Sequence, residues 1–271
     1  MKQFIFLCIV ILLIPIYLFA QDKPFMECHY AESYKDNLLE KEKIRQDEMI
    51  LRISKSSSEF FSLWRRSRQQ LQDSMLAKGA SLGDIINARD KIKYPISMQF
   101  YTIYKNYPQK GILTHTDKLF EHFYLYSEKM QCPEWKIENE KRILAGYSCQ
   151  KAVATFLGRK WIAWFTPDIP VQEGPWKLWG LPGLIIQAED ADKDYSFTCI
   201  EIKKIDGTPI NIPKKNYIKC DKAKYIKELT ESEENKEAFV RKQGGFVPIP
   251  VGENGKSGSA FPKTKFNYME R

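Results

Sequence analysis

One hairpin signal in the middle of the chain constrains the fold more than any other feature. Side chains alternate in part along CQKAVATF, residues 149–156, as they do on a strand with two different faces. Gly158 and Arg159 supply a tight turn, and KWIAWFT, residues 160–166, returns along the first run. This pattern predicts an antiparallel β-hairpin.

Short aromatic and β-branched runs continue on both sides of the hairpin. ISMQFYTIYKN, ILTHT and HFYLYSEKM precede it, and further strands are expected at 184–188, at 196–203 and at Ile218. Strand follows strand with few helical inserts, which favours an antiparallel meander over a βαβ fold. We therefore predict a mainly β (α+β) chain, with a curved antiparallel sheet or half-barrel and one or two packed helices.

The clearest helix is predicted at 60–78, with a stop at Gly79. Arg65, Arg66 and Arg68 would lie largely off its apolar stripe. We favour a solvated basic face over an anion-binding helix. The preceding residues 41–53 fit a helix or a strand equally well.

The N-terminus has the order of a secretory signal. Lys2 precedes an apolar run at 4–20, and a polar stretch follows. We expect cleavage near Ala20 or Gln21, although retention as a membrane anchor is the alternative because the run is almost long enough to span a bilayer. The predicted division is a signal peptide at 1–20 and one β-rich domain at 21–271, with a flexible Gly/Pro-rich segment at about 244–265.

The charge balance is basic, with 42 Lys+Arg against 34 Asp+Glu. In an exported protein this surplus favours anionic lipid or polysaccharide partners, and we expect no nucleic acid. Eight lysines lie between 203 and 227. They are interpreted as the solvated edge of a sheet, because lysines on an edge strand discourage unwanted pairing.

Five cysteines follow the signal, which allows at most two disulfides in an oxidising compartment. The sequence does not decide which of the five cysteines would pair in two disulfides. The pairs we predict are Cys132 with Cys149 and Cys199 with Cys220, because each would close a modest loop between neighbouring strands.

Few residues suggest catalysis or metal binding. His29, His115 and His122 stand alone, and no HExxH, GxSxG, P-loop or GxGxxG motif occurs. Glu189, Asp190 and Asp192 lack the Gly and final Glu of an EF-hand and are interpreted as a turn. We therefore predict no catalytic residue, no metal and no cofactor.

Tryptophans form the one concentrated signal. Trp161, Trp164, Trp176 and Trp179 are four of the six in the chain. Such side chains bury large areas, so a core role is favoured, and lining a ligand groove is the alternative.

The segment 146–190 closely resembles the GLPGLI family of secreted Bacteroidetes proteins. The matching features are listed in chain order: Tyr147, Cys149, Lys151 and Ala152, the Gly158-Arg159 turn, Ala163-Trp164, Pro167 and Pro170, Gly174-Pro175-Trp176, and the hexapeptide Gly180, Leu181, Pro182, Gly183, Leu184 and Ile185. The resemblance implies an exported protein of unassigned activity, in the periplasm or at the outer-membrane periphery. A weaker similarity to LolA-like lipoprotein carriers implies a sheet around a hydrophobic cavity, although fold does not establish function.

These features favour a non-enzymatic envelope protein that binds a lipid or another hydrophobic ligand, or an outer-membrane protein partner. The ligand hypothesis predicts an apolar cavity beside Trp164 and Trp179. An accessory docking protein for outer-membrane receptors, without small-molecule binding, is the first alternative. A hydrolase with dispersed catalytic residues is the second, and it requires a carboxylate or histidine pair in a cleft.

Overall fold

The computed structural model describes residues 23–92, 94–247, 261 and 264–270. The predicted signal peptide, its cleavage site and most of the predicted flexible segment at 244–265 lie outside the described residues. Within the described part, the strands are β1 (Met26–Tyr34), β2 (Arg45–Ile53), β3 (Ser58–Ser62), β4 (Thr102–Lys105), β5 (Ile112–Leu119), β6 (His122–Lys129), β7 (Lys136–Leu144), β8 (Tyr147–Phe156), β9 (Arg159–Thr166), β10 (Leu184–Asp190), β11 (Tyr195–Lys204) and β12 (Tyr217–Lys219). The helices are α1 (Leu63–Ala77), α2 (Leu82–Asp90), α3 (Lys222–Glu234) and α4 (Lys236–Lys242).

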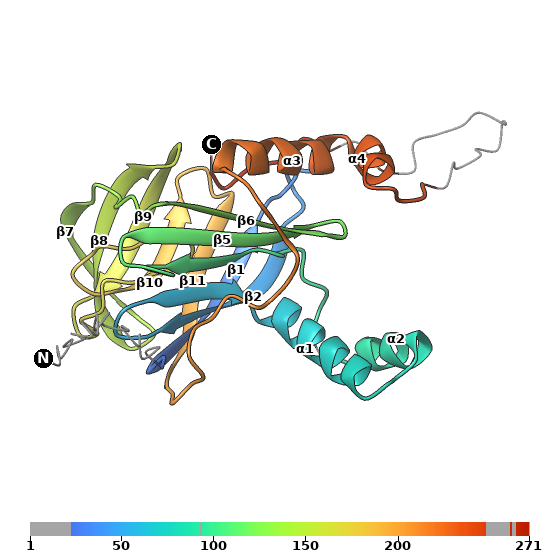
Figure 1. The fold of residues 1–271 in the computed structure, drawn as a ribbon. Helices are drawn as coiled ribbons and strands as arrows, with labels where there is room; N and C mark the ends of the chain where they lie inside the picture. Colours follow the sequence, from blue (N-terminus) through green and yellow to red (C-terminus); the bar gives the residue numbers. More distant parts are fainter. Residues whose placement is uncertain (1–22, 93, 248–260, 262–263, 271) are drawn as a thin grey trace, which may run out of the picture.

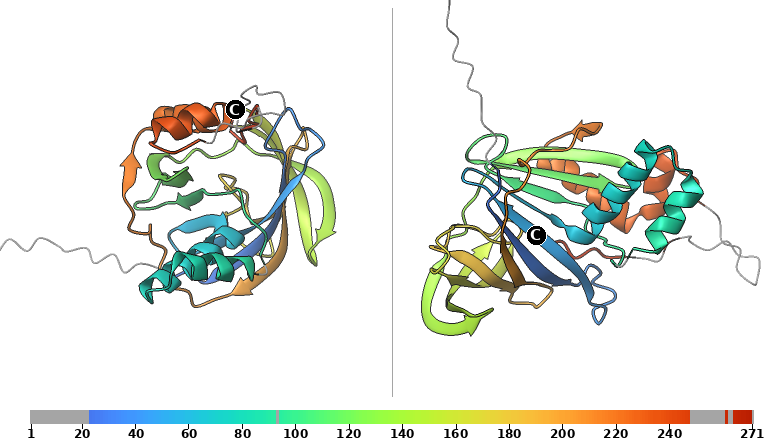
Figure 2. Two further views of the ribbon diagram at one scale, coloured as in Figure 1. Left: turned by 90° about the vertical axis from the view of Figure 1, so that its right-hand side faces the viewer. Right: turned by 90° about the horizontal axis from the view of Figure 1, so that it is seen from below.

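All twelve of these strands form one sheet, in the order β12-β6-β5-β4-β3-β2-β1-β11-β10-β9-β8-β7. Each pairing is antiparallel except that of β12 with β6. The sheet curls strongly, so that strands from the two halves of the chain face one another (Figure 2). The predicted mainly β fold with a curved antiparallel sheet is therefore confirmed.

Two helical pairs lie outside the sheet (Figure 1). Helix α3 packs on β5 and β6, and α1 leaves β3 directly. The sequence pattern predicted only one or two helices, because the charged residues of α2 and α3 show little apolar periodicity. None of the four helices in the described part of the chain is long and apolar enough to cross a membrane.

Helix α1 begins three residues later than predicted, because residues 60–62 belong to β3. The Ser62 side chain accepts a hydrogen bond from the backbone N–H of Arg65, which caps the helix. Gly79 follows the end with φ of 75°, so the predicted stop is confirmed.

The predicted hairpin is formed by β8 and β9. Its turn is made by Leu157 and Gly158, both with positive φ, and not by Gly158 and Arg159. Arg159 is instead the first residue of β9, and its side chain is buried inside the molecule.

The Gly-Leu-Pro-Gly-Leu-Ile stretch is a tight corner into β10. Leu184 and Ile185 are fully buried at the start of that strand. Gly183 has no space for a side chain, because a Cβ there would overlap the carbonyl oxygen of Thr166. The buried Lys105 contacts Glu173 at 2.6 Å and donates to the carbonyl oxygen of Leu178 at 3.3 Å. A buried cation therefore holds the preceding loop in place.

Candidate functional site

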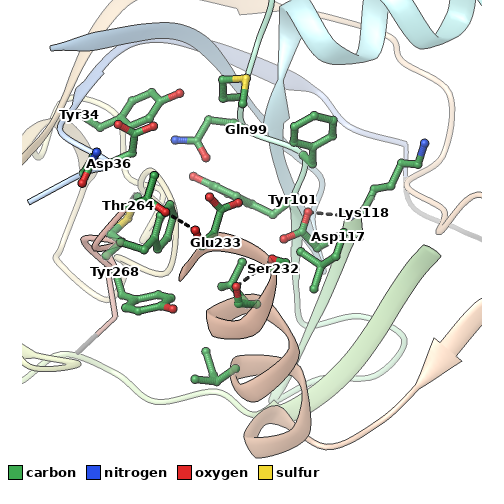
Figure 3. A pocket seen from close by; sticks show the side chains of 18 of the residues that line it. Tyr34, Asp36, Gln99, Tyr101, Asp117, Lys118, Ser232, Glu233, Thr264 and Tyr268 are labelled. Atoms are coloured by element: carbon green, nitrogen blue, oxygen red, sulfur yellow. Dashed lines mark hydrogen bonds between the residues drawn. The ribbon is translucent and has the colours of Figure 1, made fainter. Parts of the chain in front are cut away.

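A cavity of ≈ 480 Å³ lies between the sheet and helices α3 and α4. Strands β1, β5 and β6 provide one wall, and the two helices provide another. Residues 264–270, here called the C-terminal strap, also line it. Figure 3 shows side chains from these separate segments pointing into the same space.

The cavity wall is rich in aromatic side chains. Twelve Phe, Tyr and Trp residues line it, among them Tyr34, Tyr126, Trp176 and Tyr225. Tyr34 stacks on Tyr195 with an angle of 8° between their rings. A wall of this kind offers a large apolar surface with hydroxyl groups at a few points, as ligand pockets commonly do.

His115 on β5 lies among these rings. Its ring centroid is 4.9 Å from that of Tyr126, 5.0 Å from that of Tyr225 and 5.8 Å from that of Tyr101. Neither ring nitrogen has a hydrogen-bond partner among the described residues. Burial, and secondarily the charge of Lys177, lowers the pKa of His115 well below its ordinary value. The imidazole is therefore neutral at pH 7 and has hydrogen-bonding capacity to offer.

Asp117, two residues further along β5, faces the same cavity (Figure 3). The hydroxyl of Tyr225 donates a hydrogen bond of 2.6 Å to its carboxylate. Burial raises the pKa of Asp117 to about 7, and the charge of Glu233 adds to this effect. The carboxyl group consequently exists in both protonation states near neutral pH, so it can donate or accept a hydrogen bond.

Further buried acids lie beside this wall. Gln99 lines the cavity and donates to one oxygen of Glu32, whose other oxygen has no hydrogen-bond partner in the described part of the chain. Burial raises the pKa of Glu32 well above its ordinary value. Asp36 Oδ1, at the cavity wall, likewise has no such partner among described atoms. Unpaired buried polar atoms are rare in proteins and indicate a place for water or a ligand.

Arg159 fixes the C-terminal strap. Its guanidinium group is fully buried and donates to the carbonyl oxygens of Tyr268 at 2.6 Å and Met269 at 3.0 Å. It also bonds Asn267 Oδ1 at 2.7 Å and Asp190 Oδ2 at 2.6 Å. One side chain at the start of β9 thus connects the sheet to the end of the chain.

A second anchor comes from the tryptophan-rich loop. Lys177 is buried, and its ammonium group lies 2.6 Å from Glu128 and 2.9 Å from Glu270 of the strap. Lys222 at the start of α3 pairs with the same two carboxylates. These four charges join the loop, β6, α3 and the strap at one end of the cavity.

The four predicted tryptophans do not form one site. Trp161, Trp164 and Trp176 are buried in the main core, and Trp179 is partly buried. Only Trp176 lines the aromatic cavity. That cavity therefore does not lie beside Trp164 and Trp179, where the ligand hypothesis placed it. The indole N–H of Trp179 instead bonds the carbonyl oxygen of Gln131 at 2.8 Å.

Neither predicted disulfide is present, because Cys132, Cys149, Cys199 and Cys220 are all free. Cys199 lies on β11 and Cys220 directly follows β12, and these strands are seven places apart in the sheet. Sequence proximity misled the prediction, because the chain crosses the sheet between the two residues. Cys132 instead packs against Gly180, where an added Cβ would overlap its sulfur.

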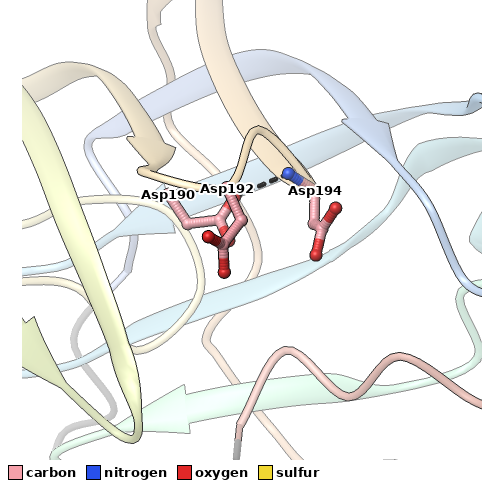
Figure 4. Close-up of side chains that lie close together, drawn as sticks. All are labelled: Asp190, Asp192 and Asp194. Atoms are coloured by element: carbon pink, nitrogen blue, oxygen red, sulfur yellow. Dashed lines mark hydrogen bonds between the residues drawn. The ribbon is translucent and has the colours of Figure 1, made fainter. Parts of the chain in front are cut away.

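The acidic run forms a turn at residues 191–194, as predicted for Asp192, whereas Glu189 and Asp190 belong to the end of β10. Asp190 accepts a hydrogen bond of 2.8 Å from the backbone N–H group of Asp194 (Figure 4). It accepts a second one of 2.8 Å from the backbone N–H group of Tyr195. The carboxylates of Asp190, Asp192 and Asp194 lie close enough together to hold a cation. Asp190 already forms a buried ion pair with Arg159, which balances the charge of its carboxylate.

Sequence reasoning missed the central acid of the cavity. His115 was noted only as an isolated histidine, and Asp117 received no role. The signal was nevertheless available, because two residues separated by one position on a strand share a face. The contributions of α3 and of the strap carried no comparable signal, since they depend on long-range packing.

Comparisons with known proteins place this arrangement in context. The family model described as "Protein of unknown function (Porph_ging)" matches residues 158–187, the segment that contains Arg159, Trp176 and Lys177. No curated protein matches the chain in sequence.

Two solved structures of PNGF-II, in space groups P21 and C2, resemble the fold with a TM-score of 0.51 each. Their sequence identities are 17% and 18%, and the likeness covers 78% of this chain. The matched part is 34% and 33% of those chains, so this chain spans about a third of their length. At this identity the likeness concerns the fold alone.

Proposed function

We propose that this protein binds a small, largely apolar organic molecule in the aromatic cavity under α3 and α4. The observation that carries the proposal is a ≈ 480 Å³ cavity lined by twelve aromatic side chains, at whose wall His115 and Asp36 have buried polar atoms without hydrogen-bond partners among the described residues. The volume lies in the usual range for small-molecule sites, about 300–1,000 Å³.

The polar groups of the wall would fix the ligand's orientation. The neutral imidazole of His115 and the carboxyl group of Asp117 lie on the same face of β5 and can each bond one polar atom of a ligand. The apolar body would then contact the surrounding rings. Each buried methylene contributes about 0.8 kcal/mol to such binding.

The test uses N-phenyl-1-naphthylamine, a neutral dye whose fluorescence rises in apolar surroundings. Wild-type protein should bind one equivalent. Ser232 on α3 is buried and lines the cavity, so Ser232→Phe should fill it and weaken dye binding at least about tenfold. Lys227→Phe is the matched control, because Lys227 is exposed on the same helix.

Both variants must melt cooperatively for the comparison to count. No dye binding by the wild-type protein, or unchanged affinity in folded Ser232→Phe, would exclude this cavity as a ligand site. Weakening in Lys227→Phe alone would place the dye on the outer surface and would equally overturn the proposal.

For the cellular setting, we propose a GLPGLI-type protein that is exported and cleaved near Ala20 or Gln21, leaving a single domain. The family-model match supports the family assignment alone, because it falls in the segment that carries the resemblance. The proposal of export and cleavage rests on the apolar run at 4–20 and the polar stretch after it. An outer-membrane partner that receives or supplies the ligand fits the same proposal, and a purely docking role remains the alternative. N-terminal sequencing of the protein from periplasmic and membrane fractions is the check, and an uncleaved cytoplasmic chain would contradict it.

One observation supports hydrolysis as a second candidate. A carboxyl group whose pKa is raised to about 7, with Glu233 beside the same cavity, has the properties of a general acid or base. Release of 4-nitrophenolate from 4-nitrophenyl esters is the assay. If the wild-type protein and Asp117→Asn show equal background rates, this candidate is removed while the binding proposal is unaffected.

A further inference from the structure

A second cavity of ≈ 340 Å³ shares part of its lining with the aromatic cavity. It is bounded by α1, by strands β3 to β5 and by residues 208–217. Gln99, Phe100, Tyr101, Asp117 and Lys118 line both cavities. The two spaces are therefore neighbours, but their charges differ.

Positive charge predominates in the second cavity. Its lining contains five cationic side chains, Arg52, Arg65, Arg66, Lys118 and Lys215, and three acidic ones, Glu59, Asp73 and Asp117. One carboxylate serves two of the cations, because Glu59 lies 2.8 Å from Arg52 and 3.1 Å from Arg66. Asp117 contributes less than a full negative charge near pH 7, since burial raises its pKa to about 7.

Arg65 carries the argument. Its guanidinium group lies 4.2 Å from the ring centroid of Phe100. It makes no hydrogen bond or ion pair with any described residue, although the side chain is partly buried. Burial, and then the nearby charge of Arg89, lowers the pKa of Arg65. The charges of Asp117 and Glu121 oppose this shift, but neither carboxylate forms a direct ion pair with Arg65. A partly buried cation without a direct ion-pair partner is unfavourable, and an anion in the cavity would relieve this.

Aromatic faces contact three of the other four cations. Arg66 lies over Phe61, and the ammonium groups of Lys118 and Lys215 lie 5.8 and 5.5 Å from the ring centroid of Phe123. Lys118 also pairs with Glu121 at 3.1 Å, and the ammonium group of Lys215 lies 3.8 Å from a carboxylate oxygen of Asp73. Among the five cations of the lining, Arg65 is therefore the one without an ion pair to a described residue. The first turn of α1 also contains no acidic residue, so the positive end of the helix adds to the potential.

We propose that this second cavity binds the acidic group of a small organic anion, a carboxylate or a phosphate ester, with Arg65 as its principal contact. The planar guanidinium group suits either oxyanion, because it can donate two parallel hydrogen bonds. Rings such as Phe100 and Phe61 line the space beside the charge and would contact the organic part. The site is independent of the neutral ligand proposed for the first cavity.

Isothermal titration calorimetry with benzoate, phenyl phosphate, inorganic phosphate and benzyl alcohol tests this. Benzoate or phenyl phosphate should bind with one-to-one stoichiometry, and benzyl alcohol should bind at least tenfold more weakly. Arg65→Gln should weaken binding of the anion at least tenfold, whereas Arg65→Lys should recover part of the loss. Lys78→Gln, which removes the same charge just beyond the other end of α1, should leave affinity unchanged.

Arg65→Gln should also bind N-phenyl-1-naphthylamine as the wild-type protein does, which shows that the first cavity remains intact. The inference is overturned if none of the anions binds, if Arg65→Gln and Lys78→Gln have equal effects, or if benzyl alcohol binds as tightly as benzoate. If inorganic phosphate binds as tightly as phenyl phosphate, the organic part of the ligand contributes nothing to affinity, and the proposal of an organic anion is refuted. If the wild-type protein binds the anions but not the dye, the first proposal is refuted and this one is unaffected.

Discussion

Replacement of Arg159 by Met gives the sharpest test of how the cavity is closed. The substitution keeps an unbranched side chain but removes the buried guanidinium group. Asp190, of which 1% is exposed, would lose its ion pair, and the strap would lose the donors to Asn267, Tyr268 and Met269. The expected result is a large fall in stability together with loosening of the strap.

The magnitude follows from these contacts. Removing one partner of a buried ion pair destabilises a protein by about 3–5 kcal/mol, because the remaining charge is left unpaired. Two backbone N–H groups still bond Asp190, so a value near the lower end, about 3–4 kcal/mol, is expected. For a chain of this size each kcal/mol shifts the melting temperature by about 2–4 °C, so the shift should be roughly 10 °C.

The assay is urea unfolding followed by near-ultraviolet circular dichroism, with thermal melts as a second measure. Arg142→Met is the matched control, because Arg142 is exposed and stacks on Trp164 at 3.8 Å. Its loss should destabilise by about 1 kcal/mol or less. If Arg159→Met destabilises no more than Arg142→Met, the assigned role of Arg159 is refuted.

Two further substitutions test the cavity acid and the corner. Relative to the wild-type protein, Asp117→Asn should be more stable at pH 8 than at pH 5. Because the pKa of Asp117 is raised to about 7, the folded wild-type protein keeps a proton that the unfolded chain loses between about pH 4 and 7. The stability of the wild-type protein therefore falls across this window by at most about 1.4 kcal/mol per pH unit, and the variant lacks this fall. Equal differences at the two pH values, measured by urea unfolding, would contradict the assignment. Gly183→Ala should destabilise the protein by at least about 3 kcal/mol, because the added Cβ overlaps the carbonyl oxygen of Thr166 and β10 must move. Gly111→Ala is the control, because the space around its Cβ is open. It should cost only the strain of a positive φ, about 1 kcal/mol. Comparable losses in the two glycine variants would show that the corner is not tightly packed.

Local patterns in the sequence were sufficient for part of the fold. The alternation along residues 149–156 and the following return run predicted the β8–β9 hairpin, and Gly79 marked the end of α1. Such features depend on neighbours only a few positions away, so side-chain periodicity and glycine chemistry reveal them. The same local reasoning predicted the strand at 184–188, although only the structure shows Thr166 against Gly183, the residue before it.

The candidate site could not be found in this way, since its members are far apart along the chain. Asp117 is separated from Tyr225 by 108 positions, and Lys177 from Glu270 by 93. The disulfide predictions failed for the matching reason, because residues close in sequence such as Cys199 and Cys220 lie on strands that are far apart in the sheet.

By itself, then, the sequence determined a mainly β chain with a curved antiparallel sheet, the β8–β9 hairpin and a basic charge balance, all of which follow from local stereochemistry and composition. Only the tertiary structure decided that three of the four clustered tryptophans are buried in the core, that Lys177 and Arg159 hold the end of the chain, and that His115, Asp117 and Arg65 face cavities. The physical reason is that burial alters pKa values and leaves polar groups unpaired, and burial exists only after distant segments have packed together.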